Sequence, residues 1–345
     1  MLRGDTVLIL GAGSSVEFGL PQGADLARKI ATDVNFYFDG NERRTGDAAL
    51  WEALFSAERS RGNEFVGAGR VISRGLPMSR SIDDFLFNHG HDQAVVDLGK
   101  SAIVASILAA ERGSRLRIEP STQADTQLPR FHGLADTWAY KLFTILATGV
   151  RRANVDQLFH NLKIIDFNYD RCVEHFFLRA VQYAYSVDEA DATRVLSSLE
   201  IVHPYGQVGR LPWQTGSTPA IAFGVGAPGA QLLALRGGIK TFTEQAHDQA
   251  EVESWRDMLR EARQIVVLGF GFHRQNLELL DPGRRDNEWP RAFVTAYGTS
   301  AADQMVFADA MQALRGFPPG GFSSPNMQNM TCAAYLDAFG LQMQA

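Results

Sequence analysis

The chain has 345 residues, of which 45% are hydrophobic and 21% charged, and its 33 basic and 39 acidic residues give a net charge of −6. This length accommodates two domains, or one large α/β domain with an insertion, and is ample for a sizeable core. The acidic balance argues against an electrostatic nucleic-acid binder, and the two distant cysteines, Cys172 and Cys332, exclude a disulfide framework and a four-cysteine zinc module.

The sequence carries no sign of export or membrane insertion. Its first residues lead directly into an apolar segment and a glycine-rich turn, without the pattern of a cleavable signal. The best apolar stretch, Ala102 to Ala110, is about half of the roughly 18 residues that a membrane span needs. We therefore expect a soluble cytoplasmic protein that does not associate with membranes.

The first predicted element is a strand over Thr6–Leu10, because a short apolar run bounded by glycine is typical of a buried parallel strand. A helix with Leu26, Ile30 and Val34 on one face follows. Residues 40–158 then lack strand signals and predict a largely helical insertion that covers the cofactor cleft. Within it we expect helices around Ile82–Asn88, Asp92–Glu111 and Asp136–Arg151, and loops at 59–74 and 113–127.

Strand character returns in the second half of the chain and alternates with helices. A helix is expected over 244–263 and another over 301–315. Strands alternating with helices indicate a parallel sheet with helices on both faces, so we predict a Rossmann-like α/β core formed by residues 1–39 and 159–345. The strands expected after the insertion are Leu162–Phe167, Glu200–Val202, Leu232–Leu235, Gln264–Leu268 and Ala292–Thr295.

Each group of candidate functional residues follows a strand, where open α/β sheets bind their ligands. After the first strand, Gly11-Ala12-Gly13 and Ser14 offer close backbone approach and free N–H groups to a pyrophosphate. The alternative is a tight strand-to-helix turn in which Ser14 and Glu17 form a capping box. A dehydrogenase fingerprint is incomplete, because Val16 stands where its third glycine or alanine belongs.

The next two groups follow the strands near residues 165 and 201. Asn168 offers a donor and an acceptor, suited to a ribose hydroxyl or a water, and Asp170 is a candidate helix N-cap. His203, close to Tyr205, is a candidate general base near neutral pH, although single histidines are more often structural.

The last group is Gly269-Phe270-Gly271 with Asn276, for which the alternative is a glycine turn packed against the sheet.

In their order along the chain, these four groups of residues resemble the motifs of the sirtuins. The resemblance rests on Gly11-Ala12-Gly13-Ser14-Ser15 with Gly19-Leu20-Pro21, on Asn168-Tyr169-Asp170, on His203 to Gly206 at the place of the catalytic His-Gly motif, and on Gly269-Phe270-Gly271 up to Asn276. Ser81-Ile82-Asp83-Asp84-Phe85 is also similar to a segment of bacterial sirtuin-like defence proteins.

Because the cysteines of a zinc ribbon are missing, the resemblance is to the sirtuin-like NAD hydrolases of bacterial antiphage defence. It implies cleavage of the nicotinamide–ribose bond of NAD, without a metal, through an oxocarbenium-like state. Asn168 would orient water or ribose hydroxyls, and Asp170 would hold the loop. Since Tyr205 stands where the motif has histidine, the catalytic position falls to either His203 or Tyr205. The expected contacts to NAD are Gly11, Ala12, Gly13, Ser14, Tyr205, Gly269, Gly271 and Asn276.

Two other functions stay open, a catalytically weak NAD or ADP-ribose sensor and an NAD-dependent deacylase, with a hydride-transfer dehydrogenase as a more distant option. The core and insertion use nearly all of the chain, so we expect control by homo-oligomerisation or by a partner protein. The resemblance offers a HerA-type ATPase or a short Argonaute as that partner. Exposed parts of the insertion and Phe317–Met330, rich in Pro, Gly, Met and Phe, are the expected contact surfaces.

Overall fold

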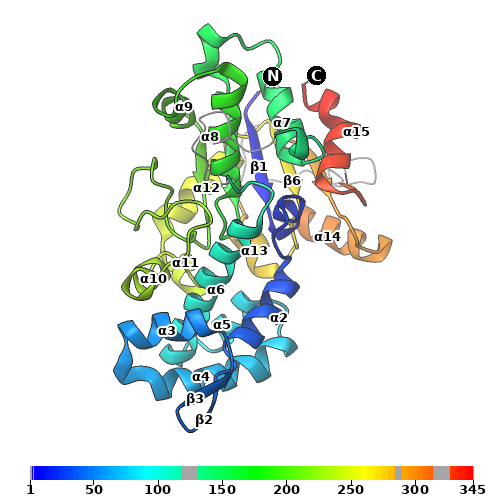
Figure 1. The fold of residues 1–345 in the computed structure, drawn as a ribbon. Helices are drawn as coiled ribbons and strands as arrows, with labels where there is room; N and C mark the ends of the chain where they lie inside the picture. The colour runs from blue at the N-terminus through cyan, green and yellow to red at the C-terminus, as the bar shows by residue number, and fades with distance from the viewer. Residues whose placement is uncertain (1, 3, 119–130, 284–289, 314–326, 345) are drawn as a thin grey trace.

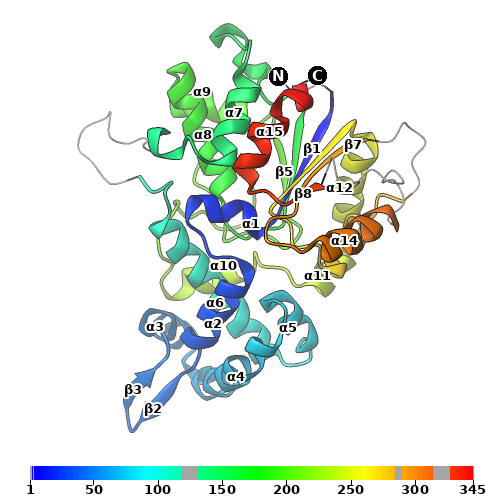
Figure 2. The same cartoon turned by 90° about the vertical axis from the view of Figure 1, so that its right-hand side faces the viewer.

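The centre of the molecule is a six-stranded, fully parallel sheet with the strand order β5-β4-β1-β6-β7-β8. Figure 1 labels β1 and β6, which lie in the middle of this sheet, and Figure 2 labels β5, β7 and β8. This computed structural model describes residue 2 and residues 4–118, 131–283, 290–313 and 327–344. The first strand lies inside the sheet, the next two extend it on one side and the later ones on the other, which is the doubly wound Rossmann order and confirms the predicted fold class. The strands are β1 (Thr6–Leu10), β4 (Leu162–Asp166), β5 (Glu200–Val202), β6 (Gln264–Leu268), β7 (Arg291–Thr295) and β8 (Met327–Gln328).

Helices cover both faces of this sheet. In β1, Val7 and Ile9 join one buried cluster, whereas Leu8 and Leu10 join the other, as the alternation of side chains along a strand requires. Because both faces are buried, the strands appear in the sequence as continuous apolar runs. The first cluster includes side chains of α12 (Gln249–Glu261), and the second includes those of α7 (Trp138–Ala147), α8 (Cys172–Tyr185), α9 (Glu189–Leu196) and α15 (Cys332–Gln344).

A helical lobe lies beyond the carboxyl edge of the sheet (Figures 1 and 2). Its central helix, α6, packs against α2, α4 and α10. Within the described chain, α6 alone is long and apolar enough to cross a membrane, but 72% of its most apolar window is buried inside the protein, as in the core helix of a soluble protein. The lobe consists of α2 (Gly23–Asp33), α3 (Ala48–Ala57), α4 (Gly62–Gly75), α5 (Ile82–Asn88), α6 (Gln93–Gly113), α10 (Gly229–Arg236) and the hairpin β2 (Tyr37–Asp39) and β3 (Glu42–Thr45).

The division between core and lobe that packing defines differs from the one expected from the sequence, in which residues 40–158 form the insertion. Helix α7 falls within 40–158, yet it packs against α8 and α15 on the sheet. Helix α10 falls outside that range, yet it packs against α3 and α6 in the lobe. The remaining α-helices of the described residues are α1 (Ala12–Ser15), α11 (Phe242–His247), α13 (Arg274–Leu279) and α14 (Ala301–Ala313).

Three of the strand, loop and helix segments predicted from the sequence are wrong. The strand expected over Leu232–Leu235 is part of α10, because its two buried leucines lie three residues apart on one helix face. The loop expected at 59–74 contains α4, whose buried stripe includes Phe65, Gly69 and Ile72. Its glycines concealed that stripe, although Gly69 serves close packing: a Cβ there would lie 2.1 Å from the Val34 carbonyl oxygen.

The third concerns the helix expected over 244–263. It is two helices, α11 and α12, separated at Asp248, whose side chain accepts a hydrogen bond from the Glu251 N–H and caps α12. Two other predicted segments, 113–127 and Phe317–Met330, lie largely outside the described residues; of the latter, Met327 is buried in β8.

Candidate functional site

A cavity of about 670 Å³ lies between the carboxyl edge of the sheet and the helical lobe. It opens where β1 and β6 adjoin, the point at which the strand order reverses and open α/β sheets bind ligands. Its walls come from the loops after β1, β4, β5, β6 and β7, and from α2 and the start of α5 in the lobe. Of the site residues expected from the sequence, the cavity is lined by Gly11, Ala12, Gly13, Asn168, Asp170, Tyr205, Gly269, Gly271 and Asn276, but not by Ser14 or His203.

The glycines after β1 and β6 hold these two turns against each other. The Gly13 N–H donates to the Gly269 carbonyl oxygen at 2.9 Å. A Cβ at Gly13 would lie 2.8 Å from Gly269 Cα, and one at Gly269, whose φ is +63°, would lie 2.1 Å from the Ser14 nitrogen. Close packing of the two turns therefore explains why glycine is needed at these positions, as the alternative reading expects. The backbone of the same glycines also borders the cavity.

The predicted capping box of Ser14 and Glu17 is wrong. The Ser14 hydroxyl donates to the Gly11 carbonyl oxygen at 2.8 Å, and α1 carries no side-chain cap. The Glu17 carboxylate instead accepts the N–H of Trp138 at 2.6 Å and that of Ala333 at 2.8 Å. It thus caps the first turns of α7 and α15, two helices distant in the sequence.

Asn168 has one side-chain atom left for a ligand. Its Nδ2 donates to the Gly11 carbonyl oxygen at 3.2 Å and lies 3.3 Å and 3.2 Å from the hydroxyls of Ser14 and Ser15. Because a carbonyl oxygen can only accept, this contact fixes which way the amide points. Within the described residues Oδ1 accepts no hydrogen bond, so the acceptor end of this cavity-lining amide is available to a ligand.

The backbone of Asn168 is held as firmly as its side chain. Its N–H donates to Asp166 Oδ1 at 2.9 Å, and its carbonyl oxygen lies 2.9 Å from His203 Nδ1. The other ring nitrogen of His203 lies 3.0 Å from Glu174 Oε1. A carbonyl and a carboxylate are both acceptors, so both ring nitrogens donate and the ring is an imidazolium.

The electrostatics of His203 agree with this assignment. Burial lowers its pKa, but the adjacent carboxylate of Glu174 more than offsets this and raises the pKa to about 9. The ring therefore holds its proton at neutral pH and has no free nitrogen. His203 is not among the residues that line the cavity, and its side chain is 8% exposed, so the structure does not give it the access to the cavity that the predicted general base requires.

Asp170 does not occupy the N-cap position that the sequence predicts for it, although its side chain holds the start of the same helix. Its carboxylate accepts the Cys172 N–H at 3.1 Å, at the first residue of α8, and the Ser15 hydroxyl at 2.8 Å. The N-cap position itself is occupied by Arg171, so Asp170 caps the helix from one residue earlier. Both carboxylate oxygens are thus engaged although the residue lines the cavity.

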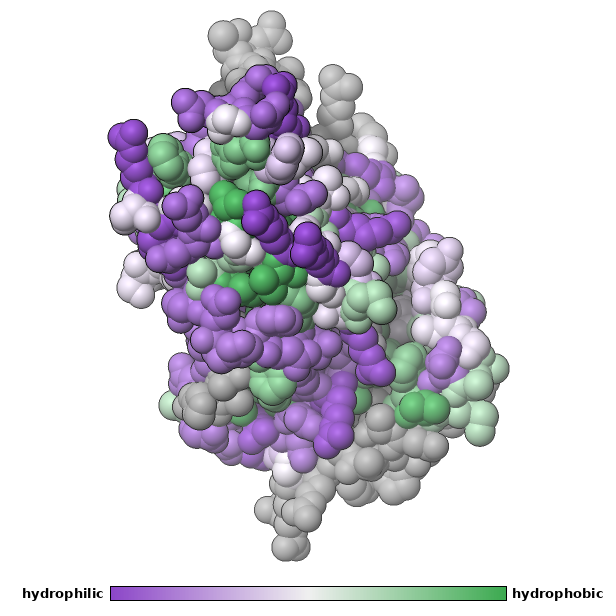
Figure 3. Space-filling view, turned by 90° about the horizontal axis from the view of Figure 1, so that it is seen from below, coloured by the Kyte–Doolittle hydropathy of each residue, from purple (hydrophilic) through white to green (hydrophobic). Residues whose placement is uncertain are grey.

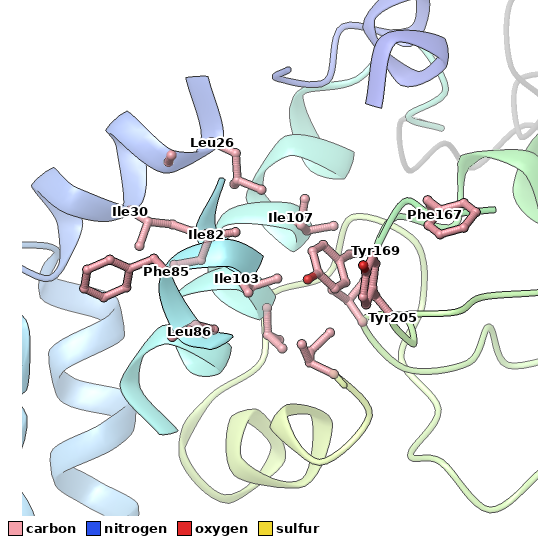
Figure 4. Packing of buried hydrophobic residues seen from close by; sticks show 14 of the residues in the cluster. Leu26, Ile30, Ile82, Phe85, Leu86, Ile103, Ile107, Phe167, Tyr169 and Tyr205 are labelled. Carbon is pink, nitrogen blue, oxygen red and sulfur yellow. The ribbon is translucent and has the colours of Figure 1, made fainter. Parts of the chain in front are cut away.

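Tyr205 and Asn276, predicted separately, are brought together. The Tyr205 hydroxyl donates to Asn276 Oδ1 at 2.6 Å. The ring of Tyr205 lies 6.5 Å from that of Tyr169, and both rings lie near Ile107 of α6 (Figure 4). Aromatic and aliphatic side chains therefore form the wall where the lobe meets the sheet.

Among the titratable residues of the cavity that sequence reasoning did not single out are Asp83 and His273. Asp83 lies in the first turn of α5, and its Oδ1 accepts a hydrogen bond from the Tyr169 hydroxyl. His273 is exposed at the N-cap of α13, directly after Phe272, whose φ of +50° is rare for a bulky residue. The resemblance of Ser81–Phe85 to a segment of sirtuin-like proteins points to Asp83. No local pattern shows that Asp83 contacts Tyr169, which lies 86 residues away in the sequence.

Comparisons with known proteins add no assignment. No protein-family model matches this chain, and a search of curated proteins finds no match.

Proposed function

We propose that this protein is an NAD hydrolase, which cleaves the nicotinamide–ribose bond to release nicotinamide and ADP-ribose. The observation that supports it most is Asn168, which lines a cavity at the point where the strand order reverses. Hydrogen bonds hold its backbone N–H, its backbone carbonyl and its side-chain Nδ2, while its side-chain Oδ1 is available to a ligand. Because this acceptor is already held in place, it can orient a water or a ribose hydroxyl without any rearrangement of the protein during the reaction.

Other features of the cavity suit a dinucleotide. Its volume of about 670 Å³ falls in the range of roughly 300–1,000 Å³ that is usual for small-molecule sites. Ala12 and its glycine neighbours present backbone to the cavity, and the exposed side chains of Arg80 and Arg274 supply positive charge at its edge for phosphates. Nicotinamide leaves as a neutral molecule, so the protein must mainly position water and stabilise the ribose cation.

In this proposal His203 acts through Asn168. As an imidazolium tied to Glu174 it fixes the Asn168 carbonyl, and it is a positioning residue. Cleavage of NAD in the cell would deplete the cofactor, and we propose antiphage defence as the context, following the sequence resemblance.

The test uses an etheno-NAD analogue, whose fluorescence rises on cleavage. We expect cleavage by the wild-type protein and a loss of at least about 100-fold in Asn168→Ala, a typical effect of lost positioning. The matched control is Asn161→Ala. Its amide donates to the Leu2 carbonyl oxygen at 3.3 Å, away from the cavity, so this variant should cleave like the wild type.

A second function, an NAD or ADP-ribose sensor, is favoured by one observation. His203, the base that the resemblance implies, lies outside the cavity with both nitrogens engaged. A sensor would bind NAD and ADP-ribose in calorimetry without any rise in etheno-NAD fluorescence. Cleavage by the wild type that is lost in Asn168→Ala excludes the sensor.

A further inference from the structure

The cavity contains several groups that could exchange a proton, but most are already engaged. Both oxygens of Glu17 and both of Asp170 accept hydrogen bonds from the protein. Burial raises the pKa of the Tyr169 and Tyr205 hydroxyls, which keep their protons at neutral pH. These four groups are therefore poor proton acceptors for a reaction in the cavity.

Asp83 differs from them in having one oxygen free. Its Oδ1 accepts the Tyr169 hydroxyl, and Oδ2 accepts no hydrogen bond from another described residue. Burial raises its pKa, whereas the Tyr169 hydrogen bond and the nearby His273 lower it. The charged and titratable groups that face it are Tyr169, Tyr205, His273 and its neighbour Asp84.

The position of Asp83 connects it with Asn168. Tyr169, which holds the Asp83 carboxylate, is the residue after Asn168, so one short loop after β4 fixes both groups at one cavity. Asn168 comes from the core and Asp83 from the lobe, so the arrangement exists only when α5 covers the edge of the sheet.

We infer that the Asp83 carboxylate is the proton acceptor for the water that attacks the ribose, an inference that rests on the proposed NAD hydrolysis. The water oxygen bonds to the anomeric carbon as the bond from that carbon to the pyridinium nitrogen breaks. The electron pair of the broken bond stays on nicotinamide, which leaves neutral. One water proton passes to Asp83 and then to solvent, so NAD and water yield ADP-ribose, nicotinamide and a proton.

The experiment measures nicotinamide release from NAD, and ADP-ribose binding by calorimetry, for Asp83→Asn and Tyr169→Phe. We expect Asp83→Asn to lower kcat at least about 100-fold, a typical effect of losing a general base, with ADP-ribose affinity retained. The matched control is Asp25→Asn on the adjacent helix α2. Its carboxylate is exposed and outside the cavity, so the same change in charge should leave kcat unaltered.

A pH profile separates proton transfer from a structural effect. The active form has Asp83 ionised, so kcat/KM should fall as pH falls through its pKa. Tyr169→Phe removes a hydrogen bond to the ionised form, so the acid limb should move to higher pH. If Asp83→Asn keeps kcat within about twofold while the wild type cleaves NAD, far from the expected loss, the inference is overturned and the proposed function stands. If the wild type neither cleaves NAD nor binds ADP-ribose, both are overturned.

Discussion

At the scale of single residues, hydrogen-bond partners decide what His203 can do. Its two ring nitrogens reach the Asn168 carbonyl and Glu174, and the carboxylate of Asp166 holds the Asn168 N–H from the other side. The second oxygens of Asp166 and Glu174 are buried and have no hydrogen-bond partner among the described residues. The positive charge on His203 thus balances buried negative charge, and it keeps the Asn168 loop in place.

Stability should therefore depend on the protonation of His203. Its folded pKa of about 9 exceeds the ordinary value of about 6.5, so its contribution is complete below the latter and is lost as pH rises through 9. By linkage this amounts to at most about 3 kcal/mol. Urea unfolding of the wild type and His203→Gln should show that the variant lacks this alkaline loss. Exposed His160→Gln should behave like the wild type, and an unchanged slope in His203→Gln would contradict the assignment.

At the scale of elements, one buried ion pair joins the helical lobe to the core. Glu111 at the end of α6 pairs with Arg171 at the start of α8, and both side chains are fully buried. Glu111 also accepts the Gly224 N–H at 3.1 Å, and Arg171 donates to the Ile221 carbonyl oxygen at 2.6 Å. Two helices and the loop at 221–224 are thus fixed beside the cavity by a single charged cluster.

Breaking this cluster should be costly. Glu111→Gln keeps the shape but leaves a buried guanidinium without its counter-charge, so we expect a loss of about 3–5 kcal/mol in the free energy of unfolding. The matched control is Asp156→Asn, which breaks the exposed pair with Arg194 and should cost less than about 1 kcal/mol. Urea denaturation measures both. A cost for Glu111→Gln no larger than the control would show that the lobe is anchored elsewhere.

At the scale of the molecule, the sequence predicts the strands and the loops that follow them, but not the contacts between segments that are distant in the chain. The apolar runs at 6–10, 162–166 and 264–268 indicate buried parallel strands, and their loops place Asn168 and the glycine turns at one sheet edge. The partners of His203 and Asp83 depend on packing between distant segments. No periodicity encodes such contacts, so the sequence does not show that His203 lies outside the cavity lining with both ring nitrogens engaged.

The last prediction concerns assembly. An NAD hydrolase must be restrained in the cell, and we propose control by self-association or a partner protein, with the wild type forming an oligomer of low basal turnover. The face shown in Figure 3 carries hydrophobic patches among mainly hydrophilic residues. On α14 the side chains of Met305 and Val306 are 68% and 62% exposed. Interaction surfaces are typically marked by contiguous exposed apolar side chains, so the adjacent Met305 and Val306 are the pair to test.

Light scattering measures the mass of the wild type and of the Met305→Ser/Val306→Ser double variant. If α14 is an interface between copies of the chain, the double variant should have the lower mass. The control is Met78→Ser, which changes a side chain that is 89% exposed on the lobe and should leave the mass unaltered. Basal NAD turnover is measured on the same samples. A monomeric wild type that cleaves NAD at full rate without any partner would overturn both the assembly and the regulation proposed for it.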